Sequence, residues 1–249
     1  MENCRRQENR DFSYLERNLR EIRASIRDAE VSSGREAGST LLLAAVKSAD
    51  TEEINYLTGV LHVTDIGENR VQQLLSRYDA LDLSGVRLHF IGSLQKNKVK
   101  YIVDKVAAIH SVDSLSLAQE IDKRARAIGK TIDVFAEINS GREENKGGIL
   151  PENASEFCRQ LDALSNIRLV GLMTMAPHCD DRREYHRYFS ETHALAERIF
   201  YRELGRIEPP LLSMGLSESF PEAIAEGADV VRVGRQLFRR EAETEEVKK

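Results

Sequence analysis

Short apolar runs alternate with longer amphipathic segments along most of this chain. The runs have four to eight residues, and the segments between them are rich in Glu, Lys, Arg, Ala and Leu, as helices usually are. The pattern predicts eight strands: Leu41–Val46, Leu61–Ile66, Arg87–Ile91, Val106–Ser111, Ile132–Asn139, Arg168–Met173, Pro210–Met214 and Val230–Val233. No cluster of consecutive hairpins interrupts the strand-then-helix order, which favours a parallel sheet.

Eight strand–helix units in a chain of 249 residues favour an α/β fold with one closed (β/α)8 barrel, the TIM barrel, over an open sheet. Ahead of the first strand, apolar residues spaced by three and four predict an extra N-terminal helix on the outside of the barrel: Phe12, Leu15, Leu19, Ile22 and Ile26. We therefore divide the chain into an N-terminal helical segment (1–40), a ligand-binding barrel (41–240) and a charged tail (241–249).

Composition narrows the class of protein. The chain has 36 basic and 41 acidic side chains, so its net charge of -5 offers no general attraction to nucleic acid or anionic lipid. No apolar stretch is long enough to span a membrane, and the polar N-terminus lacks the apolar core of a signal peptide. The three cysteines, Cys4, Cys158 and Cys179, form no zinc pattern. We expect a cytoplasmic protein with free thiols and no metal site.

Lys47 ends the run LLLAAVK, whose first six residues are apolar. A run like this predicts a strand buried on both faces, and ligands of α/β folds bind at the carboxyl ends of strands. A hydrated ammonium at such a place needs a partner or a covalent role. Lys47 is therefore either a Schiff-base lysine or a lysine that extends into solvent. Because exposed lysines are common, Lys47 taken alone favours the interpretation that its side chain extends into solvent.

Small residues follow the last two predicted strands. Ser213, Gly215 and Ser217 lie between a strand and a predicted helix at Phe220–Ala225, and Gly234 follows the final strand. Small side chains let backbone N–H groups approach an anion closely, and barrels commonly bind phosphate in the loops after strands seven and eight. Ordinary turn chemistry is the alternative interpretation.

Arg232 interrupts the apolar strand Val230–Val233, so its side chain is predicted to point inward. A guanidinium there stays charged and needs acceptors. It either pairs with a buried carboxylate or donates to a ring nitrogen or an oxyanion of a ligand. The lysines at positions 96, 98, 100 and 105 are interpreted as a solvated helix face, and no Walker loop, GxGxxG, GxSxG or HExxH motif is present.

Eight segments resemble, in order, motifs of the pyridoxal phosphate homeostasis proteins, which look like the barrel domain of alanine racemase on its own. The match runs from about Leu41 to Phe238. The segments are AAVKS at Lys47, GENRVQ at 67–72, HFIGSLQKNK at 89–98, SVDS at 111–114, INSGREENKGGI at 138–149, GLMTM at 171–175, SMGLSESF at 213–220 and VRVGRQLF at 231–238. An ordered set of this kind is far more specific than any one of its members.

The resemblance implies pyridoxal 5'-phosphate (PLP) held as a Schiff base on Lys47. It implies Arg232 against the pyridine nitrogen, Asn69 and Met173 near the cofactor, and phosphate binding around Ser213, Gly215, Gly234 and Arg235. The family is thought to buffer and deliver PLP, with apo-PLP enzymes as recipients, and has no established turnover reaction. Three positions depart from the family pattern: Ser93, Leu216, and Arg235, which stands where a small hydroxyl residue often helps to hold phosphate.

Two other functions compete with that of a carrier. One is a PLP-dependent enzyme acting on amino acids, such as a weak racemase or lyase, and the other is a module for a different phosphorylated ligand. An arginine at the pyridine nitrogen makes the ring a weaker electron sink. Racemisation also needs a second acid/base, and the chain ends soon after its last predicted strand, so we expect no domain that supplies one. We therefore predict a monomeric PLP carrier without catalytic residues.

Overall fold

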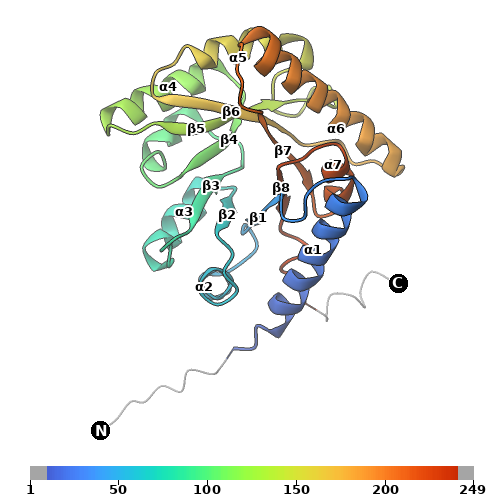
Figure 1. Cartoon of the computed structure of the whole chain (residues 1–249). Helices are drawn as coiled ribbons and strands as arrows, with labels where there is room; N and C mark the ends of the chain where they lie inside the picture. Colours follow the sequence, from blue (N-terminus) through green and yellow to red (C-terminus); the bar gives the residue numbers. More distant parts are fainter. Residues whose placement is uncertain (1–9, 241–249) are drawn as a thin grey trace.

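The computed structural model describes residues 10–240, which form a closed barrel of eight parallel strands in chain order (Figure 1). The predicted TIM barrel is therefore confirmed. The predicted tail at 241–249 and Cys4 lie outside the described residues. The strands are β1 (Leu41–Ala45), β2 (Asp65–Glu68), β3 (Arg87–Phe90), β4 (Ala108–Val112), β5 (Ile132–Ile138), β6 (Ile167–Thr174), β7 (Leu211–Leu216) and β8 (Val230–Val233). Pairing of β1 with β8 closes the barrel, with Leu43 opposite Arg232.

Helices surround the strands. The α-helices are α1 (Ser13–Ser32), α2 (Thr51–Gly59), α3 (Val71–Arg77), α4 (Leu115–Ala127), α5 (Ala154–Asp162), α6 (Arg182–Glu197) and α7 (Phe220–Ala225). Short 3₁₀ helices span Tyr78–Ala80, Lys96–Tyr101 and Pro151–Asn153, and a π-helix spans Arg198–Glu203. Within residues 10–240, no helix is both long and apolar enough to cross a membrane.

The extra N-terminal helix forms as its spacing predicts. Leu15, Leu19, Ile22 and Ile26 are buried on one face of α1, because residues three and four apart share a side of a helix. Figure 1 shows α1 beside α7 and next to the strands at which the barrel closes. The helix thus covers the junction between the first and last strands.

Two strands begin at least two residues later than the apolar pattern predicts. Leu61 and Val63 are apolar, but they end the α2 connection, because their N–H groups donate to Tyr56 O and Leu57 O. Their side chains pack on the core outside the sheet, and β2 begins only at Asp65. Val106 likewise donates to Ile102 O in a turn, so β4 begins at Ala108. Apolar turn residues therefore moved both predicted boundaries.

Alternate residues of each strand face the barrel interior. One small interior cluster joins Leu43 and Ala45 to Ile91 and Val230, and another joins Ala108, Phe135 and Met173. The rest of the described interior is unusually polar, because five buried residues from five strands project into it: Asp65, His89, His110, Ser213 and Arg232. TIM barrels usually fill this space with branched apolar side chains.

Candidate functional site

Lys47 lies two residues beyond β1, at the carboxyl end of the barrel. The ladder with β2 continues to the preceding residue, because Val46 N donates to Gly67 O at 3.0 Å. The Lys47 side chain itself is exposed. The structure therefore places a solvent-accessible amine at the end of a buried strand, where barrels bind their ligands.

Arg77 of α3 holds the backbone on both sides of Lys47. Its Nη1 donates to Ala49 O at 2.6 Å and its Nη2 to Val46 O at 3.0 Å. The guanidinium also forms a buried ion pair with Glu68 at the end of β2. Burial raises the pKa of Glu68, and the charge of Arg77 opposes that shift. Because so many bonds converge on one buried side chain, the Lys47 loop has a fixed backbone.

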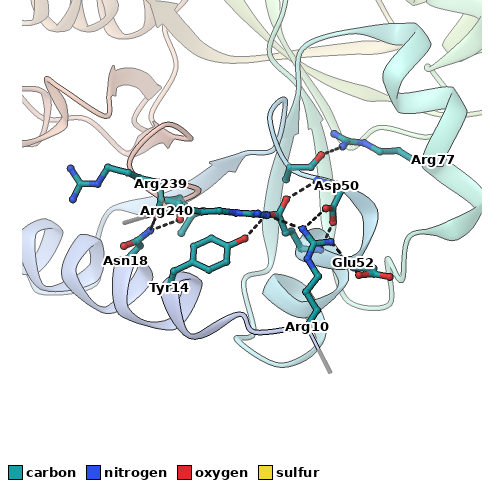
Figure 2. Close-up of polar contacts among 11 residues, drawn as sticks. Arg10, Tyr14, Asn18, Asp50, Glu52, Arg77, Arg239 and Arg240 are labelled. Atoms are coloured by element: carbon teal, nitrogen blue, oxygen red, sulfur yellow. Dashed lines mark hydrogen bonds and ion pairs between the residues drawn. The ribbon is translucent and has the colours of Figure 1, made fainter. Parts of the chain in front are cut away.

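A second polar cluster, which we call the terminal clamp, holds α2 immediately after this loop (Figure 2). Asp50 caps α2 and pairs with Arg10, with 2.5 Å between Nη2 and Oδ2. Buried Glu53 accepts hydrogen bonds from Tyr14 and from Arg240. Burial, together with the Glu53 carboxylate, raises the pKa of Tyr14 to about 12. Residues from both ends of the described chain thus hold the helix that follows Lys47.

Arg232 points into the barrel interior, as predicted, with 3% of its surface exposed. Its Nη1 donates to Ser213 O at 2.6 Å and Ser213 Oγ at 2.7 Å, and its Nη2 donates to Thr174 O at 2.7 Å. Within residues 10–240 its acceptors are thus two carbonyls and one hydroxyl, with no carboxylate among them. Burial lowers the pKa of Arg232 to about 10, and the Glu137 charge opposes that shift, so the guanidinium is cationic at neutral pH.

The loops after β7 and β8 meet at Ser217. The N–H groups of Gly234 and Gln236 both point to Ser217 Oγ, each at a long 3.4 Å, so they remain available to a stronger acceptor such as an anion. A Cβ on Gly234 would lie 2.7 Å from Ala45 O, and Gly215 has φ +91°. Glycine is therefore needed at both predicted positions.

Three residues that were predicted to contact the cofactor do not contact the N–H groups of Gly234 and Gln236. The Ser213 hydroxyl lies in the interior, between Arg232 and His110. Arg235 is exposed and paired with Glu218. Met173 is buried among Ala108 and Phe135, inside the barrel. Ser217, which shares the same small-residue loop, is the serine whose hydroxyl contacts the N–H groups, and the sequence pattern alone does not separate it from Ser213.

Asn69 follows β2 by one residue and has an unsatisfied hydrogen-bond acceptor. Its Oδ1 atom is buried and has no hydrogen-bond donor within the described part of the chain. An unpaired buried amide oxygen costs about 1–3 kcal/mol. A ligand that supplies a donor would remove that cost, so Asn69 fits a binding site at this end of the barrel.

Glu137 is a site residue that the sequence analysis missed. It lies in β5 with 6% of its surface exposed. Burial and the Asp113 carboxylate raise the pKa of Glu137 to about 7, and the charge of Arg232 opposes the shift. Both carboxyl groups lie beside Gly147, whose added Cβ would be 3.3 Å from Asp113 Oδ2 and 4.0 Å from Glu137 Oε1. A charged residue near the carboxyl end of an apolar strand was the available signal, as it was for Arg232.

Comparisons with known proteins show which proteins this chain resembles in sequence and fold. The profile of the family described as "Alanine racemase, N-terminal domain" matches residues 11–240. A pyridoxal phosphate homeostasis protein of Aquifex aeolicus is 40% identical over 222 residues, which cover 88% of this chain and 95% of that protein. The structure of PipY of Synechococcus elongatus with PLP bound is 29% identical, with a TM-score of 0.75, over 86% of this chain and 100% of PipY.

More distant structures share the fold alone. An alanine racemase of Clostridium difficile 630 is 17% identical, with a TM-score of 0.73, and the match covers 92% of this chain and 57% of the racemase. The matched residues of the family profile include every strand of the barrel and the helix α1. The chain therefore belongs to the alanine racemase N-terminal domain family and, within it, to the pyridoxal phosphate homeostasis proteins.

Proposed function

We propose that this protein binds PLP at the carboxyl end of the barrel, holds it reversibly as a Schiff base on Lys47, and so buffers or delivers the cofactor. The observation that carries the proposal is that three groups suited to PLP lie together at the carboxyl end of the barrel. These are an accessible amine at Lys47, a cationic donor at Arg232, and two convergent N–H groups at Gly234 and Gln236. The orphaned Oδ1 of Asn69 fits a ligand there as well.

The proposed roles follow from chemistry. PLP supplies an aldehyde that bonds covalently to amines and a ring that accepts electrons. A guanidinium has five N–H donors, and Arg232 uses three of them within the described protein, which leaves Nε–H and one Nη2–H for a ring nitrogen. Because this donor stays cationic, it disfavours protonation of the ring nitrogen. That arrangement suits a protein that holds PLP better than an enzyme that uses PLP for catalysis.

The remaining predicted contacts concern the phosphate and the ring face. We assign the phosphate to the N–H groups of Gly234 and Gln236, with Ser217 beside them and Gly215 allowing the close approach. Arg235 can join only by leaving its pair with Glu218. Met173 forms part of the apolar floor beneath the site, and Ser213 acts on the cofactor through Arg232.

The visible absorbance of the purified protein tests the assignment of Lys47. We expect a yellow protein whose colour borohydride bleaches, and a Lys47→Ala variant without that absorbance band. Lys96→Ala removes another exposed lysine from a 3₁₀ helix and serves as the control that keeps the band. The same band in Lys47→Ala would refute the proposed covalent site.

One observation favours a PLP-dependent enzyme acting on amino acids as a second candidate. Glu137 titrates near neutrality in the barrel interior, as a general acid/base should. Incubation with a panel of L- and D-amino acids, followed by chiral analysis, separates the two functions. A carrier converts at most one equivalent, whereas an enzyme converts many, and Glu137→Gln should then abolish that turnover.

We also propose the setting in which the protein works. Cys158 and Cys179 are both free thiols, as suits the reducing cytoplasm. Residues 41–240 form the binding unit and the α1 segment packs on it, so a monomer is sufficient for the site. Apo-PLP enzymes are the proposed recipients of the cofactor. Sedimentation of the purified protein with and without an apo-PLP enzyme would measure both the monomer and the transfer complex.

A further inference from the structure

A chain of hydrogen bonds crosses the barrel interior from β2 to β8. Asp65 Oδ1 lies 3.0 Å from His89 Nε2, and His89 Nδ1 lies 2.9 Å from His110 Nε2. His110 Nδ1 lies 2.9 Å from Ser213 Oγ, which is 2.7 Å from Arg232 Nη1. All five side chains are buried, with exposed fractions of 6% or less. Burying polar groups in a barrel core costs free energy unless every group is hydrogen-bonded, so this hydrogen-bond chain needs an explanation.

Donor and acceptor chemistry gives this chain one direction. An ionised Asp65 can only accept, so His89 carries a proton on Nε2, and a neutral His89 then accepts at Nδ1. His110 must then donate from Nε2 and accept at Nδ1, which leaves the Ser213 hydroxyl as its donor. Ser213 Oγ therefore presents its lone pairs to Arg232. Every link is satisfied with two neutral histidines and no polar atom left over.

The charges around the chain support that assignment. Burial opposes ionisation of Asp65, but hydrogen bonds from His89 and Thr64 and the charge of Arg87 hold its pKa below the usual value. Burial, with the charge of Arg232, holds the pKa of His110 well below its usual value, so this ring is neutral. Glu137 is the titratable group whose charge acts on Arg232, and Phe135 stacks on the His110 ring. The chain thus runs between a carboxylate and a guanidinium.

We propose that Asp65, His89 and His110 are positioning residues for Arg232. Through Ser213 they hold an acceptor against Nη1 of a guanidinium that has no carboxylate in direct contact within residues 10–240. Arg232 is thereby fixed in orientation, with its Nε–H and second Nη2–H left for the ligand. The consequence for PLP rests on the proposed function, whereas the direction of the hydrogen bonds does not.

The direction is tested on the protein without cofactor. Long-range ¹H–¹⁵N spectra of the histidine rings at pH 7 should show both His89 and His110 neutral and protonated on Nε2. Protonation on Nδ1 in either ring, or a cationic His110, would overturn the inference. His186, which is half-exposed on α6 and bonded to Glu226, supplies an internal reference outside the chain.

The link to the ligand is tested by Asp65→Asn, which keeps an acceptor for His89 but removes the charge. We expect PLP to dissociate about ten-fold more readily, since a hydrogen bond to a charged group is worth about 1.5–3 kcal/mol. Asp133→Asn removes a carboxylate from a surface pair with Arg168 and should bind PLP as the unaltered protein does. An unchanged PLP dissociation constant in Asp65→Asn would overturn the positioning role.

Two further measurements keep the outcomes separate. Replacing His110 by Phe breaks two links of the hydrogen-bond chain, but this variant can fail to fold. Ser213→Ala deletes only the hydroxyl link, so it should fold and should weaken PLP binding, as Asp65→Asn should. Loss of the visible band in Lys47→Ala tests the proposed function independently of the chain. A protein that loses its band in Lys47→Ala but shows Nδ1-protonated His110 would retain the proposed function and refute this inference.

Discussion

Lys47 and Arg232 lie at the same end of the barrel but are held in opposite ways. The loop of Lys47 is fixed through its backbone by ionic groups, namely the Arg77–Glu68 pair and the terminal clamp, while the lysine side chain is exposed. Arg232 is fixed through its side chain by two carbonyls and a hydroxyl. The group that we propose to form and release a bond keeps its freedom, and the group that we propose only donates hydrogen bonds is locked.

Removing the ionic support of the Lys47 loop should have the largest effect. Arg77→Ala leaves Glu68 buried and unpaired, along with two carbonyl groups, and should lower the free energy of unfolding by about 3–5 kcal/mol. Urea unfolding measures this loss. Arg168→Ala, which breaks a surface pair with Asp133, should cost at most about 1 kcal/mol. Equal losses in the two variants would show that the loop does not depend on Arg77.

The surroundings of Arg232 can be probed through the pH dependence of stability, because Glu137 lies near it. The folded pKa of Glu137, about 7, lies above the unfolded value of 4.5, so between these pH values the folded protein binds one more proton than the unfolded chain. Stability should therefore fall as pH rises from about 4.5 through 7, by about 3 kcal/mol in all. Glu137→Gln should flatten this fall in unfolding experiments between pH 5 and 8. A variant with the same pH profile as the parent would exclude Glu137 as its source.

A smaller effect is expected where the two regions touch. Gly234 lies against Ala45 at the junction of β8 and β1, and the Cβ of Gly234→Ala would be 2.7 Å from Ala45 O. Overpacking of this kind costs about 1–3 kcal/mol, and calorimetry of the variant should show it with weaker phosphate binding. Gly59→Ala, at the end of α2 with no atom within 4 Å of the added Cβ, should be neutral or slightly stabilising.

The smallest effect on stability belongs to Lys47 itself. Because its side chain is exposed, Lys47→Ala should change the free energy of unfolding of the cofactor-free protein by no more than about 0.5 kcal/mol. Thermal unfolding of the two proteins without PLP checks this. A large loss would mean that the ammonium is part of the fold, which would end the contrast with Arg232.

Much of this arrangement could be predicted from the sequence, because burial leaves a local signal. Eight apolar runs predict the barrel, and a single charged residue in or after such a run draws attention to Lys47 and Arg232. The errors at β2 and β4 arose because Leu61, Val63 and Val106 pack on the core from outside the sheet, and apolarity alone cannot distinguish such residues from strand residues.

The residues that could not be predicted depend on contacts across the barrel. Asp65, His89 and His110 come from three different strands, and Ser213 meets His110 only because the closed barrel brings β7 opposite β4. The raised pKa of Glu137 likewise depends on burial in the closed barrel and on Asp113 from the neighbouring strand end. Similarly, the structure alone separates Ser217, beside the N–H groups, from Ser213, beneath them.

The terminal clamp has a consequence for the order in which the site is assembled during synthesis. Lys47 leaves the ribosome long before Arg232 and Arg240, which complete the site and the clamp from the far end of the described chain. A nascent chain therefore carries the amine but lacks the proposed ring partner, the proposed phosphate cradle and the seam between β1 and β8. Binding of PLP at the proposed site would thus come late in the life of each molecule, after translation of β8 and Arg240.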